Sequence, residues 1–160
     1  MRVGIGYDVH QLISGEDLIL GGIKIDHSSG LKGHSDADVL LHAVMDAMLG
    51  AIGAGDIGKH FPDSDPAYEG ISSLKLLSEV NSLLTKQGYS IINIDVTIIA
   101  QKPKLASYLE KMEKRIAEVL DISLTKINLK ATTTEGLGYI GNEAGIAAQA
   151  IVSLESAGYE

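Results

Sequence analysis

The chain has 160 residues, a formal net charge of −8 at pH 7 and no cysteine. The lack of cysteine excludes disulfide bridges, thiolate metal sites and a cysteine nucleophile, and the acidic balance argues against a nucleic-acid partner, which basic stripes would bind. No apolar run approaches the roughly 18 residues that a membrane span requires, so no membrane partner is expected. The length predicts a single domain over residues 1–160.

The first third of the chain is predicted to form two strands and a helix. Residues 2–7 and 18–25 have the pattern of strands, the second with a bend or bulge at Gly21-Gly22. A helix is predicted from Asp36 to Ile52, with Ser35 as its cap and acidic residues at its positive N-terminal end.

A long loop rich in Gly, Pro and Asp covers residues 53–71, and loops of this length in a compact domain are more often functional than idle. The elements predicted beyond it are a helix over 73–87, a strand over 90–100, a helix over 105–120, a strand over 127–132, a loop over 133–145 and a strand over 146–154. The alanine content of the last segment leaves a helix open as an alternative. This order predicts an α+β fold, with a mixed β-sheet and helices packed on one face.

The chain is apolar for its size, with a mean hydropathy of +0.15. Because large exposed apolar patches usually mark interfaces, we expect part of this surface to be buried against other subunits. The N-terminus runs directly into a strand-like segment, so neither a signal peptide nor a transit peptide is expected.

The segment Asp8-Val9-His10 places a carboxylate and an imidazole two residues apart. In an extended chain these side chains point to the same side, where they can converge on a divalent metal ion. The alternative interpretation is a hydrogen-bonded turn at the end of a strand.

The helix over residues 36–52 is apolar apart from a stripe formed by Asp38, His42 and Asp46. A solvated face is the alternative, but such faces usually carry Lys, Glu, Gln or Arg, which form helices more readily than Asp and His. A histidine that binds a metal needs its second ring nitrogen held, often by a carboxylate. Asp38 and Asp46 are the candidates for that role.

Asp8, His10 and His42 together would supply one carboxylate and two imidazoles. Zinc accepts this ligand set, and the fourth position stays open for water or substrate, as in catalytic sites. A closed structural zinc site is not expected without cysteine.

Three loops have groups that bind phosphate. Residues 33–36 place His34 just before a predicted helix N-terminus, where free N–H groups attract anions. Residues 56–66 offer backbone amides and aspartates, and residues 130–138 offer three threonine hydroxyls and Glu135, a ligand for a hard cation such as Mg²⁺. The alternatives are a plain capping turn and ordinary turns.

Seven segments carry a resemblance in order and spacing: Asp8–His10, Leu20–Gly22, His34–Val39, Gly55–Gly58, Phe61–Asp63, Asp95–Gln101 and Lys130–Glu135. With them the chain resembles the 2-C-methyl-D-erythritol 2,4-cyclodiphosphate synthases over essentially its whole length. The resemblance implies a phosphorus–oxygen lyase of the non-mevalonate isoprenoid pathway. In this family the 2-phosphate of 4-diphosphocytidyl-2-C-methyl-D-erythritol 2-phosphate attacks the β-phosphorus, which yields the cyclic diphosphate and CMP.

The resemblance also implies a homotrimer with active sites between neighbouring subunits, in agreement with the surplus of apolar residues. It implies a location in the bacterial cytoplasm or, for a mature form, in the plastid stroma.

Carried over residue by residue, the resemblance makes Asp8, His10 and His42 the ligands of Zn²⁺ and Glu135 a ligand of a second divalent cation, Mg²⁺ or Mn²⁺. It makes His34 and Thr133 the catalytic residues that position and polarise the phosphates. The substrate-binding residues that it implies are Ser35, Asp56, Ile57, Gly58, Phe61, Pro62, Asp63, Ser64, Asp65, Ala100, Gln101, Lys102, Pro103, Lys104, Leu105, Ala106, Ala131, Thr132, Thr134 and Tyr139. Among them, residues 100–106 with Ala131 and Thr132 match the cytidine pocket.

The chain departs from the family near the trimer axis. Asn142 stands where relatives usually have an arginine, beside a cavity that can hold an isoprenoid diphosphate. Tyr7 and Tyr139 stand where relatives often have phenylalanine. These changes leave the implied metal ligands untouched.

Two other functions remain as alternatives. A zinc-dependent phosphohydrolase would use the same three ligands to activate water, and its product would be a linear phosphate ester. A nucleotide-binding or isoprenoid-sensing module would bind CDP without turnover.

Overall fold

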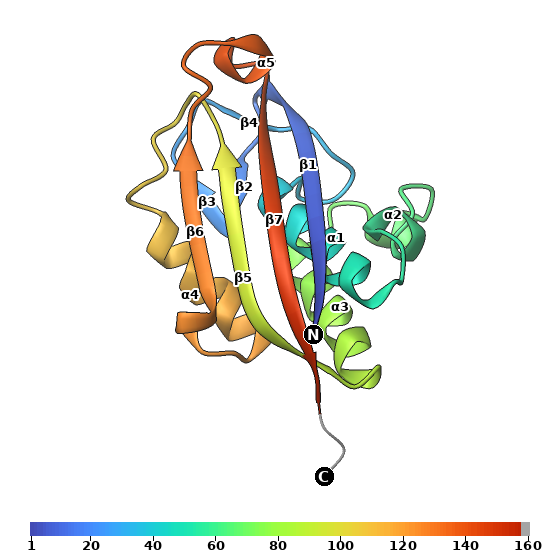
Figure 1. Ribbon diagram of the computed structural model, residues 1–160. Coiled ribbons are helices and arrows are strands. Elements are labelled where there is room, and N and C mark those ends of the chain that lie inside the picture. Colours follow the sequence, from blue (N-terminus) through green and yellow to red (C-terminus); the bar gives the residue numbers. More distant parts are fainter. Residues whose placement is uncertain (158–160) are drawn as a thin grey trace.

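A five-stranded sheet forms the centre of the computed structural model, which describes residues 1–157 (Figure 1). The strand order is β4-β1-β7-β5-β6. The β5–β6 pair is parallel, and the other pairs are antiparallel, so the predicted mixed sheet is confirmed. The strands are β1 (Arg2–Ser14), β4 (Ser29–Leu31), β5 (Tyr89–Ile99), β6 (Ile127–Thr132) and β7 (Gly145–Ser156).

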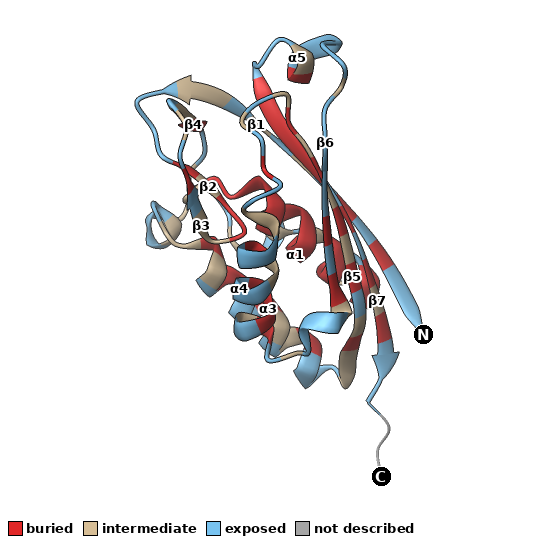
Figure 2. Cartoon of the chain, turned by 90° about the vertical axis from the view of Figure 1, so that its left-hand side faces the viewer, coloured by how far each residue is buried: buried red, intermediate tan, exposed pale blue. Residues whose placement is uncertain are grey.

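Three helices lie on one face of this sheet, as predicted: α1 (Val39–Ile52), α3 (Ser73–Lys86) and α4 (Leu109–Leu120) (Figure 2). The smaller elements are a hairpin of β2 (Leu18–Leu20) and β3 (Ile23–Ile25), the short helices α2 (Ile57–His60) and α5 (Gly138–Gly141), and the 3₁₀ turns η1 (Pro66–Tyr68) and η2 (Leu124–Lys126). None of the helices in residues 1–157 combines the length and the apolarity that crossing a membrane requires.

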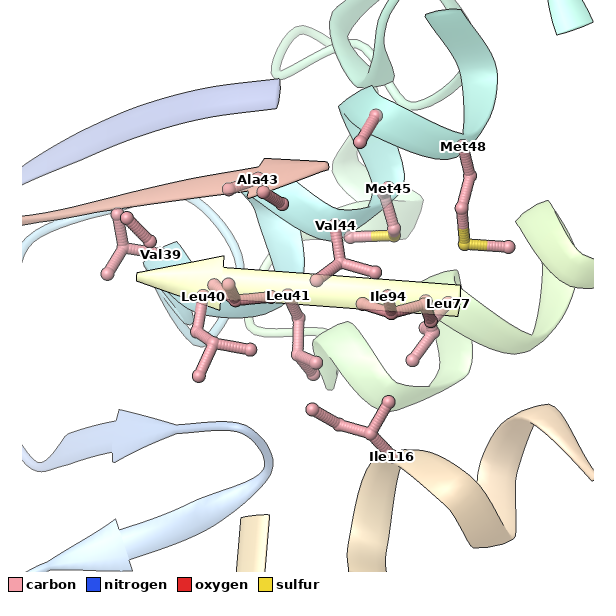
Figure 3. Packing of buried hydrophobic residues seen from close by; sticks show 14 of the residues in the cluster. Val39, Leu40, Leu41, Ala43, Val44, Met45, Met48, Leu77, Ile94 and Ile116 are labelled. Atoms are coloured by element: carbon pink, nitrogen blue, oxygen red, sulfur yellow. The ribbon is translucent and has the colours of Figure 1, made fainter. Parts of the chain in front are cut away.

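The hydrophobic core lies between the sheet and the three helices (Figure 3). Helix α1 is buried almost all round, because β1 and β7 cover one side and α3 covers another. Its Leu40, Leu41 and Met45 are fully buried, as are Leu77 of α3 and Ile94 of β5.

Two glycines let β1 lie directly against α1. A Cβ atom on Gly4 would lie 1.9 Å from the carbonyl oxygen of Ala47, and one on Gly6 would lie 1.9 Å from that of Ala43. Because alternate residues of a strand face the same side, Asp8 and His10 continue the row of Gly4 and Gly6 toward α1. The strand therefore delivers these two side chains to the helix.

The elements near the N-terminus differ from their predicted bounds. Strand β1 runs to Ser14 instead of ending at residue 7, because β7 pairs with it as far as Gln11 and β4 pairs with Leu12–Ser14. The segment predicted as one strand over 18–25 is a hairpin, since Gly21 and Gly22 both take positive φ and form its turn.

Two helices begin later than predicted. Asp38, not Ser35, caps α1 and accepts a hydrogen bond from the Leu41 amide, while Ala37 has the left-handed φ of 56° that a helix excludes. Helix α4 begins at Leu109 instead of residue 105. The predicted loop over 133–145 contains α5, and β7 confirms the strand interpretation of the last segment.

The sheet face opposite the helices carries an apolar surface, which we call the outer face. It includes Val3, Ile5, Tyr7 and Val9 of β1 and Ile151 of β7, and Ile5 is 62% exposed. Within residues 1–157 no helix packs across this surface (Figure 2).

We predict that Gly6→Ala lowers the free energy of unfolding by about 2–4 kcal/mol. Overpacking usually costs ~1–3 kcal/mol, and the cost is higher here because the new methyl group would collide with the backbone of α1, which cannot move aside as a side chain can. Gly50→Ala is the matched control. Gly50 lies on the exposed part of α1, where alanine is expected to stabilise the helix by about 0.5–1 kcal/mol. Urea unfolding followed by circular dichroism measures both values, and equal effects of the two changes would contradict the proposed close contact.

Candidate active site

Asp8, His10 and His42 converge at the point where β1 meets the first turns of α1. Asp8 Oδ2 lies 2.8 Å from His10 Nε2 and 3.1 Å from His42 Nδ1, and the two nitrogens are 3.2 Å apart. Ligands placed tetrahedrally around zinc at 2.0–2.1 Å are separated by roughly 3.3 Å, so the spacing and the chemistry of these three atoms fit a metal ion.

The far nitrogen of each imidazole also has a partner. His10 Nδ1 donates to the Lys32 carbonyl oxygen at 2.7 Å, and a carbonyl can only accept. His42 Nε2 lies 3.1 Å from the hydroxyl oxygens of both Ser35 and Ser73. Both rings are therefore held from behind while their other nitrogens face Asp8.

The charges within this group depend on one another. Burial alone would raise the pKa of Asp8, but the imidazoles of His10 and His42 beside it outweigh that effect and hold the pKa well below its usual value. Burial alone would lower the pKa of His10, but the Asp8 carboxylate and the Lys32 carbonyl raise it above its usual value. Asp8 therefore stays a carboxylate, and its negative charge favours a proton on His10 or a metal ion bound beside it.

The roles predicted for Asp38 and Asp46 behind His42 are wrong. Asp38 is completely buried and accepts hydrogen bonds from the amides of Gly21, Gly22 and Leu41, which tie the β2–β3 turn to α1. Burial raises its pKa to about 6, against the effect of those donors. Asp46 accepts from the Ile57 amide at 2.8 Å and so positions α2.

Ser73 holds His42 instead, and Asp36 in turn holds Ser73; neither role was predicted from the sequence. Ser73 is the first residue of α3 and is fully buried, and its hydroxyl donates to Asp36 Oδ1 at 2.5 Å. The only sequence signal was a serine at a predicted helix start, which is too common to indicate a buried contact with a histidine 31 residues away.

The metal-ligand group lies at a cavity of about 260 Å³. His34 also lines it, and its Nε2 is buried without a hydrogen-bond partner in residues 1–157. His34 is not beside a helix N-terminus as predicted, because α1 begins only at Val39 and Asp38 occupies that end. The other lining residues are Gly33, Ser35, Ile57, Gly58, Phe61, Asp63, Tyr68 and Leu76.

A second cavity, of about 200 Å³, lies where the parallel strands β5 and β6 end. It brings together most of the residues that the resemblance placed around cytidine, namely Ala100, Gln101, Pro103, Lys104, Leu105, Ala106, Ala131 and Thr132, and Thr133, predicted as catalytic, also lines it. Gln101 also accepts a hydrogen bond from the Gly136 amide, which connects this cavity to the loop of Glu135.

Several predicted residues have structural contacts outside both cavities. Asp56 and Asp65 cap the short helices α2 and η1. Pro62 and Ser64 lie in the turn between these helices, and the Pro62 carbonyl accepts from the Asp65 amide.

The remaining predicted residues lie around the loop that contains α5. Lys102 pairs with Glu143 at 2.9 Å, and the Thr134 hydroxyl donates to the Leu137 carbonyl. The Tyr7 and Tyr139 hydroxyls are 2.7 Å apart at one end of the outer face, and this hydrogen bond raises the pKa of Tyr7 to about 12.

The two cavities lie at different parts of the sheet. The first is built on β1, whereas the second is built on the edge strand β6 and its neighbour β5. Strands β7 and β5 separate β1 from β6, so the sheet holds them roughly 14 Å apart. A single chain therefore does not bring the two groups of predicted residues together.

Comparison with known proteins connects this architecture to a family. The model of the YgbB family matches residues 1–155. A curated relative from Agathobacter rectalis, named 2-C-methyl-D-erythritol 2,4-cyclodiphosphate synthase, is 66% identical over 154 residues, which cover 96% of this chain and 87% of the relative.

Two solved structures share the fold. IspF of Plasmodium falciparum, solved as a CDP complex, has 35% identity and a TM-score of 0.86, with 98% of this chain and 97% of that chain covered. The bifunctional IspDF of Campylobacter jejuni has 42% identity and a TM-score of 0.94 over 97% of this chain, which spans only 42% of that longer protein. The family predicted from the motifs is confirmed, and the chain belongs to the YgbB family.

Proposed function

We propose that this chain is the enzyme that converts 4-diphosphocytidyl-2-C-methyl-D-erythritol 2-phosphate into 2-C-methyl-D-erythritol 2,4-cyclodiphosphate and CMP, a step of isoprenoid biosynthesis. The observation that carries the proposal is the convergence of Asp8, His10 and His42 at a cavity in a chain 66% identical to a synthase of that name. The reaction forms a bond between a 2-phosphate oxygen and the β-phosphorus, while CMP leaves with the electron pair of the broken bond.

Asp8, His10 and His42 are proposed to hold Zn²⁺. One carboxylate oxygen and two imidazole nitrogens suit zinc, and three protein ligands leave a position for a phosphate oxygen. When bound, the ion supplies positive charge and a template for the phosphates, as Lewis acids do in phosphoryl transfer.

Charge and position are the main demands of this reaction, because one phosphate attacks another and both are negative. His34 is proposed to donate from Nε2 to a phosphate oxygen, since this nitrogen has no hydrogen-bond partner among residues 1–157. The Thr133 hydroxyl, which lines the second cavity, is proposed to donate to the diphosphate.

Glu135 is the proposed ligand of a second divalent cation, Mg²⁺ or Mn²⁺. Its carboxylate is exposed and lies 3.4 Å from the Thr133 hydroxyl, so the two groups can face the same diphosphate. Carboxylate oxygens are the ligands that these hard cations prefer. On a chain with a net charge of −8, cations are needed to hold a polyanionic substrate.

The substrate is proposed to occupy both cavities. The methylerythritol phosphate would lie in the first cavity, against Gly58, Phe61 and Asp63, and the cytidine in the second, against residues 100–106. The solved CDP complex of the Plasmodium falciparum relative supports a cytidine nucleotide as ligand.

A homotrimer with active sites between subunits is proposed to join the two cavities. Within one chain β7 lies between β1 of the first cavity and β5 of the second, and this separation supports an arrangement in which the first cavity of one subunit meets the second cavity of its neighbour. The apolar outer face offers the surface for such an assembly, and closed rotational symmetry is usual in homo-oligomers.

Because the curated relative comes from a bacterium, we propose that this chain works in the bacterial cytoplasm.

The first prediction from this proposal concerns the metal ligands. His42→Ala is expected to reduce zinc from one equivalent per chain to a small fraction and to slow CMP release by at least about 100-fold, because it removes one of three ligands. His27→Ala, on the segment between β3 and β4, is the control. Elemental analysis measures the zinc content, and nucleotide chromatography measures CMP release. Unchanged zinc and activity in His42→Ala would disprove the ligand set. A linear phosphate ester as the product of the wild-type enzyme would indicate a phosphohydrolase.

The second prediction concerns pH. Without metal, the raised pKa of His10 makes its proton compete with zinc at the imidazole. Protonated His10 stabilises the metal-free fold at low pH, and this contribution is lost as the pH rises through the raised pKa. Zinc affinity should therefore increase with pH, by up to about tenfold per unit, until His10 is neutral. Calorimetry in buffers of different ionisation enthalpy should detect the released proton, and an affinity that does not change between pH 6 and 8 would count against this account.

The third prediction concerns assembly. Sedimentation equilibrium is expected to give three times the 16.9 kDa mass of one chain. Ile5→Asp should shift the mass toward one chain and abolish activity, because it places a charge on the outer face. Leu124→Asp, an equally apolar exposed position on η2, should leave the trimer intact. A monomeric wild-type enzyme with full activity would exclude sites shared between subunits.

A further inference from the structure

We infer that Ser73 is a positioning residue for the metal ligand His42, because it fixes the imidazole in the tautomer that carries its proton on Nε2. This inference rests on the proposed metal site at Asp8, His10 and His42. It assigns a role in the reaction to a residue on α3, which contributes no ligand to that site.

A chain of hydrogen bonds leads from His42 away from the cavity. His42 Nε2 lies 3.1 Å from Ser73 Oγ, and Ser73 Oγ lies 2.5 Å from Asp36 Oδ1. The other Asp36 oxygen accepts from the Ser73 backbone amide at 2.9 Å. Asp36 therefore accepts hydrogen bonds from both the amide and the hydroxyl of Ser73. These two bonds hold the Ser73 hydroxyl oxygen beside the His42 ring.

The direction of the hydrogen bonds follows from the number of protons. A carboxylate can only accept, so the single hydroxyl proton of Ser73 points to Asp36. The lone pairs of Ser73 Oγ are then all that faces His42, and Nε2 must donate to them. In a neutral imidazole with its proton on Nε2, the other nitrogen, Nδ1, is bare and faces Asp8 and His10.

The hydrogen bond between Ser73 and His42 matters because both residues are buried. Ser73 is fully buried and His42 is 8% exposed, so water has little access to replace a lost partner. Ser35 also lies 3.1 Å from Nε2, but its oxygen accepts from the Ala37 amide, and within residues 1–157 no carboxylate or carbonyl takes its proton as Asp36 takes that of Ser73. Ser73, whose proton is committed to Asp36, is the residue that determines the tautomer.

The competing tautomer would block the metal site. With its proton on Nδ1, His42 would donate to Asp8 Oδ2 at 3.1 Å and would offer no lone pair to a metal ion. The Asp8 carboxylate favours that arrangement when no ion is bound, and the contact with Ser73 opposes it. Removing the Ser73 hydroxyl should therefore weaken metal binding without removing any ligand.

The test compares Ser73→Ala with Ser72→Ala. The first variant loses the hydroxyl but keeps the backbone amide that donates to Asp36. The second makes the same change one residue earlier, at a side chain that forms no capping hydrogen bond. Competition with a chelator should show that the zinc dissociation constant of Ser73→Ala rises by about 10- to 100-fold, and that of Ser72→Ala does not change. CMP release by Ser73→Ala should return to near the wild-type kcat when zinc is saturating, with KM unchanged.

A second measurement tests the tautomer itself and needs no variant. In the zinc-loaded wild-type enzyme labelled with ¹⁵N-histidine, the His42 Nε2–H signal should be present and slow to exchange with solvent. In Ser73→Ala the same proton should exchange faster.

The outcomes separate this inference from the proposed metal site. Wild-type zinc affinity in Ser73→Ala, or a wild-type His42 without a proton on Nε2, would overturn the role of Ser73 while the metal site stands. A wild-type enzyme that binds no zinc would overturn the metal site, and the inference with it.

Discussion

The close approach of β1 to α1 is the constraint on which the site depends. Because Gly4 and Gly6 have no side chains, the strand lies against the helix backbone, and the next two residues in the same row are Asp8 and His10. The helix places His42 opposite them. The close packing of β1 on α1 therefore also brings the three candidate ligands together. The cap that starts α1 contributes as well, since buried Asp38 fixes the first turn of the helix against the β2–β3 hairpin.

The electrostatics of the site explain how an acidic chain can handle an anionic substrate. Asp8 keeps its negative charge because His10 and His42 surround it, and a concentrated negative charge beside two imidazoles favours a bound cation. Behind His42, fully buried Ser73 and half-buried Asp36 hold the ring through a chain of hydrogen bonds. Asp8 on one side and Ser73 on the other therefore contact the two nitrogens of the same His42 imidazole.

Much of this could be predicted from the sequence, and the failures have physical reasons. Alternation and β-branched residues identified β1, β5, β6 and β7, whereas β4 and the β2–β3 hairpin were not predicted. Asp-x-His on a strand with a histidine on an apolar helix identified the metal-ligand group. The roles of Asp38 and Asp46 were misjudged, because spacing along a helix shows which side chains share a face but not which backbone amides another segment brings to them. Ser73 was missed because its contact with His42 joins two helices, and no local pattern encodes that packing.

The central claim is that one zinc ion binds Asp8, His10 and His42 together. X-ray absorption at the zinc edge of the purified wild-type enzyme tests it directly, because scattering from imidazole rings differs from that of single oxygen atoms. The account predicts two imidazole nitrogens and further oxygen ligands at about 2.0–2.2 Å, with no sulfur. A spectrum with one imidazole or none would contradict it.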